Sequence, residues 1–421
     1  MATNSLNPSP SLSLAGHPPE RGRAEHPGFP MSVEDMNIEE VVPINPVNSG
    51  PAIGTVDIAG VSGMSDLNSL SEQITHVLHS GAVFSDIFIH EGSPLMLKQP
   101  NRVVAVADTY VERRALEDFF QILDPQWREK IKVRAIDKGV DLTDFRIRAN
   151  FFSFQGRKGL GAVVRRFPRE PVPLTELGLH QDAQKFAQLR HGLVLIIGDT
   201  SQGKSTTLAS ILDEINRTRS GHIVTVEDPV ELLIPSRKCM ITQREVGPDA
   251  DVESFYHGTR DSLRQRPEVV MIGEIRDMET ALEAVALAES GPLVFATLHA
   301  KSTEFGLMKM LRLLGDTENQ AQALAQTLRG TICQALIPSL NGEAWHLASE
   351  VMTVNHDLAR MIEQRNLSRI RPMMDSMAHQ GCHLMNTDLL ALYDNGQIRF
   401  EDARRATTDL PKFSAQFKPR N

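Results

Sequence analysis

The feature that most limits how this chain can fold is a glycine-rich loop between an apolar run and a helical pattern. The apolar run 193–197 is followed by the pattern G-x-x-x-x-G-K-S, which begins at Gly198 and ends at Ser205. Beyond the loop, apolar residues starting at Leu208 recur at the i, i+3, i+4, i+7 spacing of one helix face. A strand, a glycine-rich loop and a helix in this order predict a P-loop, which is a phosphate-binding element.

The residue types of this loop suit the binding of ATP with Mg²⁺. In a P-loop, backbone N–H groups surround the phosphate oxygens, a lysine neutralises their charge, and a hydroxyl group ligates the metal ion. Lys204 and Ser205 stand at the last two positions, and the positive end of the following helix adds to the site. A glycine-rich turn without a ligand is the alternative, and the flanking strand and helix argue against it. The candidate nucleotide-binding residues are Gly198, Thr200, Ser201, Gln202, Gly203, Lys204, Ser205 and Thr206.

Length, charge and cysteine content narrow the class of protein. A chain of 421 residues exceeds the roughly 100–200 residues of one domain, so we expect two or three domains. A net charge of −9 argues against attraction of the whole surface to nucleic acid or anionic lipid. Cys239, Cys333 and Cys382 show no C-x-x-C pairing, which predicts buried thiols in a reducing cytosol. Without an apolar run of 18 residues or a secretory signal pattern, we expect a cytoplasmic protein with no membrane span.

Composition and periodicity divide the chain into five segments. A disordered arm rich in Pro, Ser, Asn and Gly comes first, followed by a small α+β domain and a proline-rich linker. Apolar strands then alternate with helices, which predicts a mostly parallel sheet covered on both faces, and the last segment is mostly helical. The expected segments are the arm 1–62, the α+β domain 63–168, the linker 169–175, the sheet domain 176–340 and the helical region 341–421.

Polar side chains follow three further strands that we expect in the sheet domain. Glu227 and Glu231 come after the strand 223–226, Glu274 follows the strand 269–272, and His299 follows the strand 293–297. Ligands of such sheets bind at the carboxyl ends of the strands, where these side chains would meet the P-loop. Hydrolysis of a γ-phosphate needs a metal ion, a carboxylate that orients water, and donors for the developing negative charge. Taken singly, an acid at the end of a strand is more often a helix N-cap or a surface charge, so the prediction depends on the combination and order of these groups.

Four motifs in this order resemble those of the bacterial type II/IV secretion-system motor ATPases. The resemblance is nearest to the PilT retraction motors and to the DotB-type motors of type IVB secretion and conjugation, and it covers about residues 65–340. It implies a RecA-like P-loop ATPase domain that follows a small PAS-like α+β domain and precedes a helical region. The motifs are a Walker A at 198–207, an Asp box V-E-D-P-V-E at 226–231, an atypical Walker B I-G-E-I-R-D at 272–277 and a His box ending at His299; Q-R-E-V at 243–246 also matches.

This resemblance implies a role for each polar group near the P-loop. Lys204 and Ser205 would hold the phosphates and Mg²⁺, and Glu231, the second acid of the Asp box, would position or activate the attacking water. Glu274 would act through the magnesium shell, so Ser205 and Glu274 are the candidate metal residues. His299 would sense the γ-phosphate.

Two arginines of the small domain are candidates for arginine fingers. The segment R-I-R-A-N-F-F at 146–152 matches the family pattern R-x-R-x-N-x-F, and G-A-V-V-R at 161–165 matches a later arginine strand. In the family, such arginines reach the ATP from the adjacent subunit or across the domain cleft, which implies that role for Arg148 and Arg165. Without the resemblance, alternating arginines on the solvent face of a strand would explain the pattern equally well.

The sequence departs from the family pattern at two places. Asp199 and Ser201 stand where the family usually has proline and glycine, and Asp199 brings a negative charge near the phosphates. The segment 357–363 matches only partly the A-I-R-N-L-I-R-E motif of the retraction motors. This second departure favours a secretion or conjugation machine over pilus retraction.

The expected function is therefore that of a homohexameric ATPase that drives a type IVB secretion or conjugation apparatus. Its expected partners are other copies of itself and the platform proteins of the inner membrane, on whose cytoplasmic side it would act. A type IV pilus retraction (twitching) motor is one alternative. A non-hydrolysing, nucleotide-gated assembly factor is another, against which the presence of both Glu231 and Glu274 argues. A RecA-like DNA helicase or a small-molecule kinase is the third, and the acidic charge balance argues against nucleic acid as a direct substrate.

Overall fold

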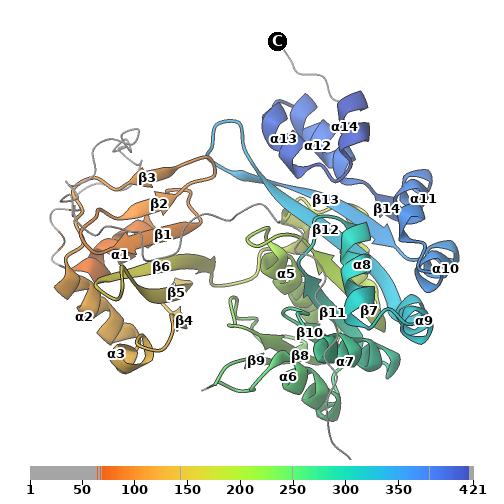
Figure 1. Ribbon diagram of the computed structural model, residues 1–421, viewed down its shortest axis with the longest axis horizontal. Coiled ribbons are helices and arrows are strands. Elements are labelled where there is room, and N and C mark those ends of the chain that lie inside the picture. The colour runs from red at the N-terminus through yellow and green to blue at the C-terminus, as the bar shows by residue number, and fades with distance from the viewer. Residues whose placement is uncertain are drawn as a thin grey trace, which may run out of the picture. The chain divides into compact units, whose positions relative to one another are not determined.

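The described part of the chain contains two separate β-sheets. The computed structural model describes residues 64, 67, 69–142, 144–248, 250–378 and 380–416, and the expected arm 1–62 lies outside them. The first sheet has six strands and belongs to the small α+β domain, whereas the second has eight strands and carries the P-loop (Figure 1).

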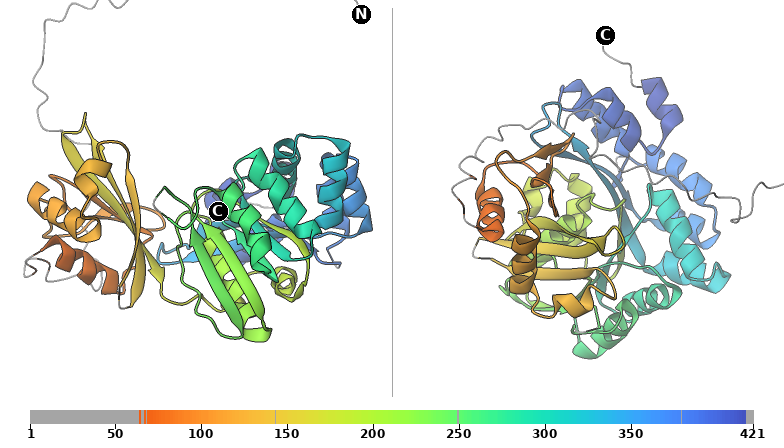
Figure 2. Two further views of the ribbon diagram at one scale, coloured as in Figure 1. Left: turned by 90° about the horizontal axis from the view of Figure 1, so that it is seen from below. Right: turned by 60° about the vertical axis from the view of Figure 1, so that its left-hand side comes forward.

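The six-stranded sheet is antiparallel throughout, with the strand order β3-β2-β1-β6-β5-β4. Helices α1 and α2 pack on one of its faces (Figure 2), where Ile74, Phe120 and Phe151 are fully or almost fully buried. The strands are β1 (Asp86–His90), β2 (Met96–Lys98), β3 (Val103–Ala105), β4 (Ile136–Asp141), β5 (Phe145–Phe154) and β6 (Gly159–Pro168), and the helices are α1 (Leu70–His79), α2 (Arg113–Leu123) and α3 (Trp127–Lys130).

The alternation of β5 explains where the arginines of the small domain point. Ile147, Ala149 and Phe151 are buried in the core, and since successive side chains of a strand point to opposite faces, Arg146 and Arg148 lie on the other face. The arginine face is therefore the one that the helices of this domain leave open.

The eight-stranded sheet has the order β14-β13-β12-β7-β11-β10-β8-β9. Its strands from β12 to β9 are parallel, and β13 and β14 are antiparallel additions at one edge. The four predicted strands are confirmed as β7 (Gly192–Ile197), β8 (Gly221–Glu227), β10 (Val269–Ile272) and β11 (Leu293–Leu298). The others are β9 (Cys239–Glu245), β12 (Leu328–Pro338), β13 (Trp345–Thr353) and β14 (Cys382–His383).

Helices cover both faces of this sheet, so its central strand β7 is buried completely. Leu195 and Ile197 enter a core shared with α7, α8 and α9, whereas Val194 and Ile196 enter a core shared with α4 and α5. The helices of this part are α4 (Gln181–Gln184), α5 (Lys204–Thr218), α6 (Phe255–Ser262), α7 (Met278–Glu289), α8 (Thr303–Leu313), α9 (Glu318–Thr327), α10 (His356–Glu363), α11 (Ile370–Ser376), α12 (Met385–Asp394), α13 (Phe400–Ala406) and α14 (Leu410–Gln416). None of the helices in the described segments combines the length and apolar character that crossing a membrane requires.

The sequence did not predict the two long strands after α9. The region 341–421 is predicted to be mostly helical, but β13 and β14 lie within it, and β12 lies before it in the predicted sheet domain, where no strand was predicted after residue 297. Both strands bury polar side chains, among them Gln334 and Glu350, which are bonded by groups distant in sequence. These polar residues interrupt the apolar pattern on which a strand assignment depends.

Candidate nucleotide-binding site

The glycine-rich loop connects β7 to α5, as the sequence predicted, and its glycines are sterically required. Gly203 precedes α5 with a φ of +81°, a conformation that glycine adopts without strain. A Cβ atom on Gly198 would lie 2.8 Å from the carbonyl oxygen of Gln334 on β12. The loop therefore lies directly against β12, with the first N–H groups of α5 free for a ligand.

Lys204 is buried at the start of α5, and no carboxylate in the described segments lies within hydrogen-bond distance of its ammonium group. Only 9% of its surface is exposed, and its Nζ donates hydrogen bonds to the carbonyl oxygens of Gly198 (2.9 Å) and Asp199 (2.7 Å). Burial lowers the pKa of this ammonium group, which Glu274 nearby opposes. A phosphate oxygen could replace these two neutral carbonyl acceptors and would relieve part of the burial cost.

A cavity of about 460 Å³ opens beside Lys204 and brings most of the predicted site residues together. Its lining includes the P-loop and the carboxyl ends of the neighbouring strands, as expected for this class of sheet. The predicted residues that line it are Arg148, Arg165, Thr200, Ser201, Gly203, Lys204, Ser205, Thr206, Glu231, Glu274 and His299.

Two predicted residues do not line this cavity. Gly198 and Gln202 border a neighbouring cavity of about 310 Å³, together with Asp199. The Gln202 side chain accepts a hydrogen bond from the Leu336 N–H (2.6 Å), and its carbonyl accepts one from Gln334 (2.7 Å), so it fastens the loop to β12. Asp199, which the sequence analysis expected to bring a negative charge near the phosphates, borders this second cavity and not the one beside Lys204.

The two acids of the Asp box occupy different environments. Glu227 is 8% exposed, and its carboxylate accepts hydrogen bonds from Thr225 (2.7 Å) and Gln243 (3.0 Å). Glu231 has 17% of its side chain exposed, and its Oε1 lies 3.2 Å from Arg148 Nη1. Of the two, Glu231 is the carboxylate that a water molecule can reach more easily.

Burial raises the pKa of Glu227 to about 7, although its hydrogen bonds from Gln243 and Thr225 act in the opposite direction. Between pH 4.5 and 7 the folded chain therefore keeps a proton on Glu227 that the unfolded chain has lost. The contribution of this proton to the free energy of unfolding is complete at low pH and disappears as the pH rises to 7. Relative to wild type, Glu227→Gln should become more stable from pH 5 to pH 8, by on the order of 1–3 kcal/mol. Urea unfolding at both pH values measures this change. Glu279→Gln, which changes an exposed acid, is the control. If the free energies of unfolding of Glu227→Gln and wild type differ by the same amount at both pH values, the raised pKa of Glu227 is wrong.

Glu274 is held between a cation and a histidine. Its Oε2 lies 2.7 Å from Arg276 Nη2, and its Oε1 lies 3.2 Å from His299 Nε2. Burial by itself would raise the pKa of Glu274, but the hydrogen bond from Arg276 and the charges around it bring the pKa below its usual value. Burial and the charge of Lys204 lower the pKa of His299, so this imidazole is neutral at neutral pH. The arrangement supplies an ionised carboxylate and a neutral histidine beside Lys204.

The two predicted arginines of the small domain both reach this site within the chain. Arg148 contacts Glu231 as described and also donates to Asp137 Oδ1 (3.0 Å) on β4. Arg165 donates to Asp86 Oδ1 (2.8 Å) and to the Ser201 hydroxyl (3.2 Å) in the P-loop. Each guanidinium group is thus anchored by a carboxylate of its own domain and extends to a group of the P-loop domain, which a plain solvent-facing arginine would not do.

Sequence reasoning assigned no role to three residues that shape this site. Arg276 pairs with Glu274 and also lies 3.9 Å from Asp228, and Gln243 bonds both Glu227 and the Leu232 carbonyl oxygen (2.8 Å). Arg146 donates to the Val230 carbonyl oxygen (2.9 Å) in the Asp box. All three lie inside motifs that the sequence analysis matched, namely I-G-E-I-R-D, Q-R-E-V and R-x-R-x-N-x-F. Their position in these motifs could have indicated that they belong to the site.

The fold and the loop together define a class of protein. A mostly parallel sheet, a glycine-rich loop after its central strand and a helix that begins at the loop's lysine make up a RecA-like P-loop domain. A family model described as "Type II/IV secretion system protein" matches residues 139–388. The chain belongs to this family of secretion and pilus motor ATPases.

Curated relatives and solved structures agree with this assignment. The type IV pilus ATPase PilU of Pseudomonas aeruginosa is 33% identical over 332 residues, which are 76% of this chain and 84% of PilU. The pilus retraction ATPase PilT of the same organism is 33% identical over 261 residues, 62% of this chain and 74% of PilT. A crystal structure of PilT with bound ADP matches with a TM-score of 0.71 and 31% identity, covering 83% of this chain and 100% of that chain. The Legionella pneumophila ATPase DotB shares the fold, with a TM-score of 0.67, 22% identity and coverage of 80% and 94%.

Proposed function

We propose that this protein is a magnesium-dependent ATPase that works as a homohexameric motor on a membrane-embedded pilus, secretion or conjugation apparatus. The observation that carries the proposal is the cavity beside Lys204, which is lined by the P-loop, four acidic side chains, His299 and four arginines, with Glu231, Glu274, Arg148 and Arg165 among them. These are the groups that phosphoryl transfer to water requires. The solved PilT structure contains ADP, which supports a nucleotide as the ligand of the corresponding cavity here.

The cavity offers suitable donors for Mg²⁺. The Ser205 hydroxyl and the Glu274 carboxylate are oxygen donors that line it, and Mg²⁺ is commonly bound by few protein groups together with water and substrate phosphates. Within the described residues no cluster of three or more His, Cys, Asp or Glu is arranged to hold a metal ion, so the nucleotide would complete the site. When bound, the ion would neutralise charge on the β- and γ-phosphates.

The chain's own residues divide the remaining work. Lys204 would exchange its two carbonyl acceptors for oxygens of the β- and γ-phosphates. Glu231 would orient the attacking water, and Arg148, already in contact with it, would stabilise charge on the transferring group. Arg165 would approach the phosphates from its position on Ser201, and His299, as a neutral donor beside Glu274, would detect the γ-phosphate.

Glu231→Gln should bind ATP with nearly native affinity and hydrolyse it at least about a hundredfold more slowly, because an amide cannot accept a proton from water. Glu227→Gln should retain clearly more activity, since Glu227 is buried and already bonded by Thr225 and Gln243. Fluorescent-nucleotide binding and phosphate release measure the two properties, with the exposed Glu279→Gln as the control. Native turnover by Glu231→Gln, with an inactive Glu227→Gln, would reverse the assignment.

Two kinds of apparatus are candidates for the one that this protein drives. PilU and PilT, each 33% identical, are both type IV pilus ATPases, and the similarity to PilT, a retraction ATPase, favours a pilus retraction motor. The partial match of the segment in α10 to the retraction motif favours a type IVB secretion or conjugation apparatus. Either role places the protein on the cytoplasmic side of the inner membrane with platform proteins as partners. Deletion of the gene, followed by measurement of twitching motility and conjugative transfer, separates the two: loss of twitching alone supports retraction, and loss of transfer alone supports secretion or conjugation.

A further inference from the structure

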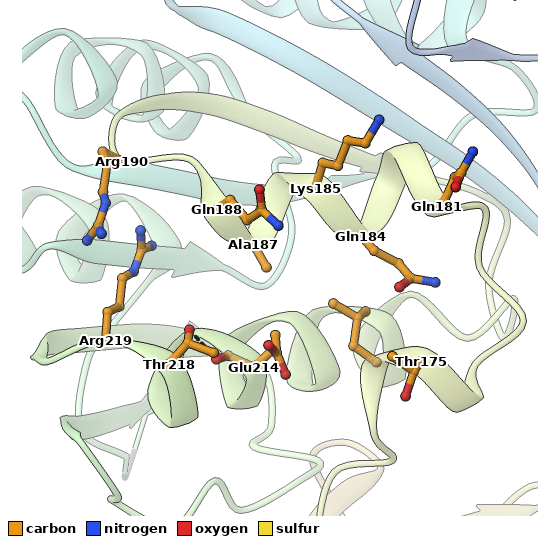
Figure 3. Close-up of a pocket in the computed structure, with 11 residues that line it drawn as sticks. Thr175, Gln181, Gln184, Lys185, Ala187, Gln188, Arg190, Glu214, Thr218 and Arg219 are labelled. Atoms are coloured by element: carbon orange, nitrogen blue, oxygen red, sulfur yellow. Dashed lines mark hydrogen bonds between the residues drawn. The ribbon is translucent and has the colours of Figure 1, made fainter. Parts of the chain in front are cut away.

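A third cavity, of about 500 Å³, lies at the opposite end of α5 from the P-loop. It is bounded by α4 and the short helix η4 (Lys185–Gln188) on one side and by the last turns of α5 on the other (Figure 3). It shares no lining residue with the cavity beside Lys204. Since α5 has 15 residues, about 22 Å of helix separates the two sites.

Two arginines converge on one end of this cavity. Figure 3 shows the guanidinium groups of Arg190 and Arg219 directed toward one another, Arg190 after η4 and Arg219 at the end of α5. Arg219 is half-buried and donates to the Leu189 carbonyl oxygen (2.5 Å), and Arg190 is exposed. Burial and then the charge of Arg190 lower the pKa of Arg219, whereas Cys239 and Glu268 act in the opposite direction.

Three cations near this cavity are each paired with a carboxylate, unlike Arg190 and Arg219. Arg217 and Arg237 share the buried Asp213 at 2.6 and 3.2 Å, and Lys185 lies 2.6 Å from Asp182. In the described part of the chain, neither Arg190 nor Arg219 has a carboxylate within 4 Å. Two like charges with no carboxylate in direct contact are unfavourable, and an anion between them would offset the repulsion.

We propose that this cavity binds the phosphate group of a small soluble molecule, which Arg190 and Arg219 hold between them. Guanidinium groups match phosphate oxygens with paired hydrogen bonds. The volume is in the range of small-molecule sites, roughly 300–1,000 Å³. Gln184, Gln188 and Thr218 add uncharged hydrogen-bonding groups along the lining. This ligand site is separate from ATP hydrolysis and does not depend on it.

One carboxylate in the lining allows a sharp test of the charge argument. Glu214 lies one turn before Thr218 on α5 and is the single acid among the described residues that line the cavity. If the ligand is an anion, Glu214 repels it. Glu214→Gln should therefore tighten binding, whereas loss of either arginine should weaken it.

The experiment titrates pyrophosphate and inorganic phosphate into the full-length Lys204→Ala chain by calorimetry, so that the P-loop has lost its phosphate-binding cation. We expect saturable binding that Arg190→Gln and Arg219→Gln each weaken about ten- to hundredfold, as for charged hydrogen bonds. Glu214→Gln should strengthen it by about twofold or more. Arg264→Gln, an exposed arginine outside the cavity, is the matched control and should bind as the parent does. Circular dichroism confirms that each variant is folded.

Three results would overturn the proposal. The first is no saturable binding of either probe in the parent chain, and the second is binding that both arginine variants leave unchanged. The third is binding only to vesicles of anionic phospholipid, lost in the arginine variants, which would identify a lipid surface as the ligand of this arginine pair.

Discussion

Lys204→Ala should reduce magnesium-dependent ATP hydrolysis by at least about a thousandfold. Removing a single preorganised donor from a reaction centre already costs about 10²–10³ in rate, and Lys204 carries a full charge in a buried position. Among the described residues its ammonium group donates hydrogen bonds to two carbonyl oxygens and to no carboxylate, so alanine breaks no direct ion pair and the fold should tolerate the change. Phosphate release under saturating ATP measures the effect.

Lys238→Ala is the matched control for this prediction. Lys238 is an exposed lysine of the same domain and does not line the cavity beside Lys204. Its variant should keep the native rate. If Lys204→Ala also kept the native rate, hydrolysis would have to take place somewhere other than the P-loop.

Arg148→Ala should bind ATP and yet hydrolyse it about 10³–10⁵ times more slowly, which is the range measured for arginine fingers. One lysine and one metal ion leave part of the charge on the transferring phosphate unneutralised, and Arg148 is the cation beside Glu231. Arg165→Ala should act in the same direction through its contact with Ser201. The control is Arg134→Ala, an exposed arginine of the same domain that does not line the cavity.

A mixture of variants decides which chain supplies the arginine. In the structure Arg148 and Arg165 meet Glu231 and Ser201 of their own chain, so a mixture of Arg165→Ala and Glu231→Gln chains should remain inactive. Mixtures of each variant with wild-type chains should keep activity in proportion to the wild-type share. Recovery of activity in the first mixture would show that the arginine comes from the adjacent subunit.

The candidate site was largely predictable because its residues lie in short motifs at the ends of strands. Lys204, Glu231, Glu274 and His299 are each fixed in sequence distance from a buried apolar strand, and parallel strands bring their carboxyl ends to one edge. Contacts between distant segments were not predictable in this way. The bond of Gln334 to the P-loop joins residues 132 positions apart, and nothing in the local pattern indicates it.

The fold was predictable where burial produces a regular pattern and not where polar groups are buried. The core strands β7, β10 and β11 are continuous apolar runs, which the sequence shows directly. In β13, by contrast, Glu350 is almost completely buried because Arg371 (3.1 Å) and Thr408 (3.0 Å) bond its carboxylate. Such partners become visible only once the chain is folded, so the strands at that edge of the sheet were missed.

Release of labelled phosphate from γ-labelled ATP by the purified full-length chain, in a single turnover with excess protein, tests the central claim most directly. The account predicts release that requires Mg²⁺, stops with EDTA and is absent in Lys204→Ala and in Glu231→Gln, although Glu231→Gln still binds ATP. ATP that is bound tightly but never cleaved, at any protein concentration, would contradict the account and indicate a nucleotide-gated assembly factor instead of a motor.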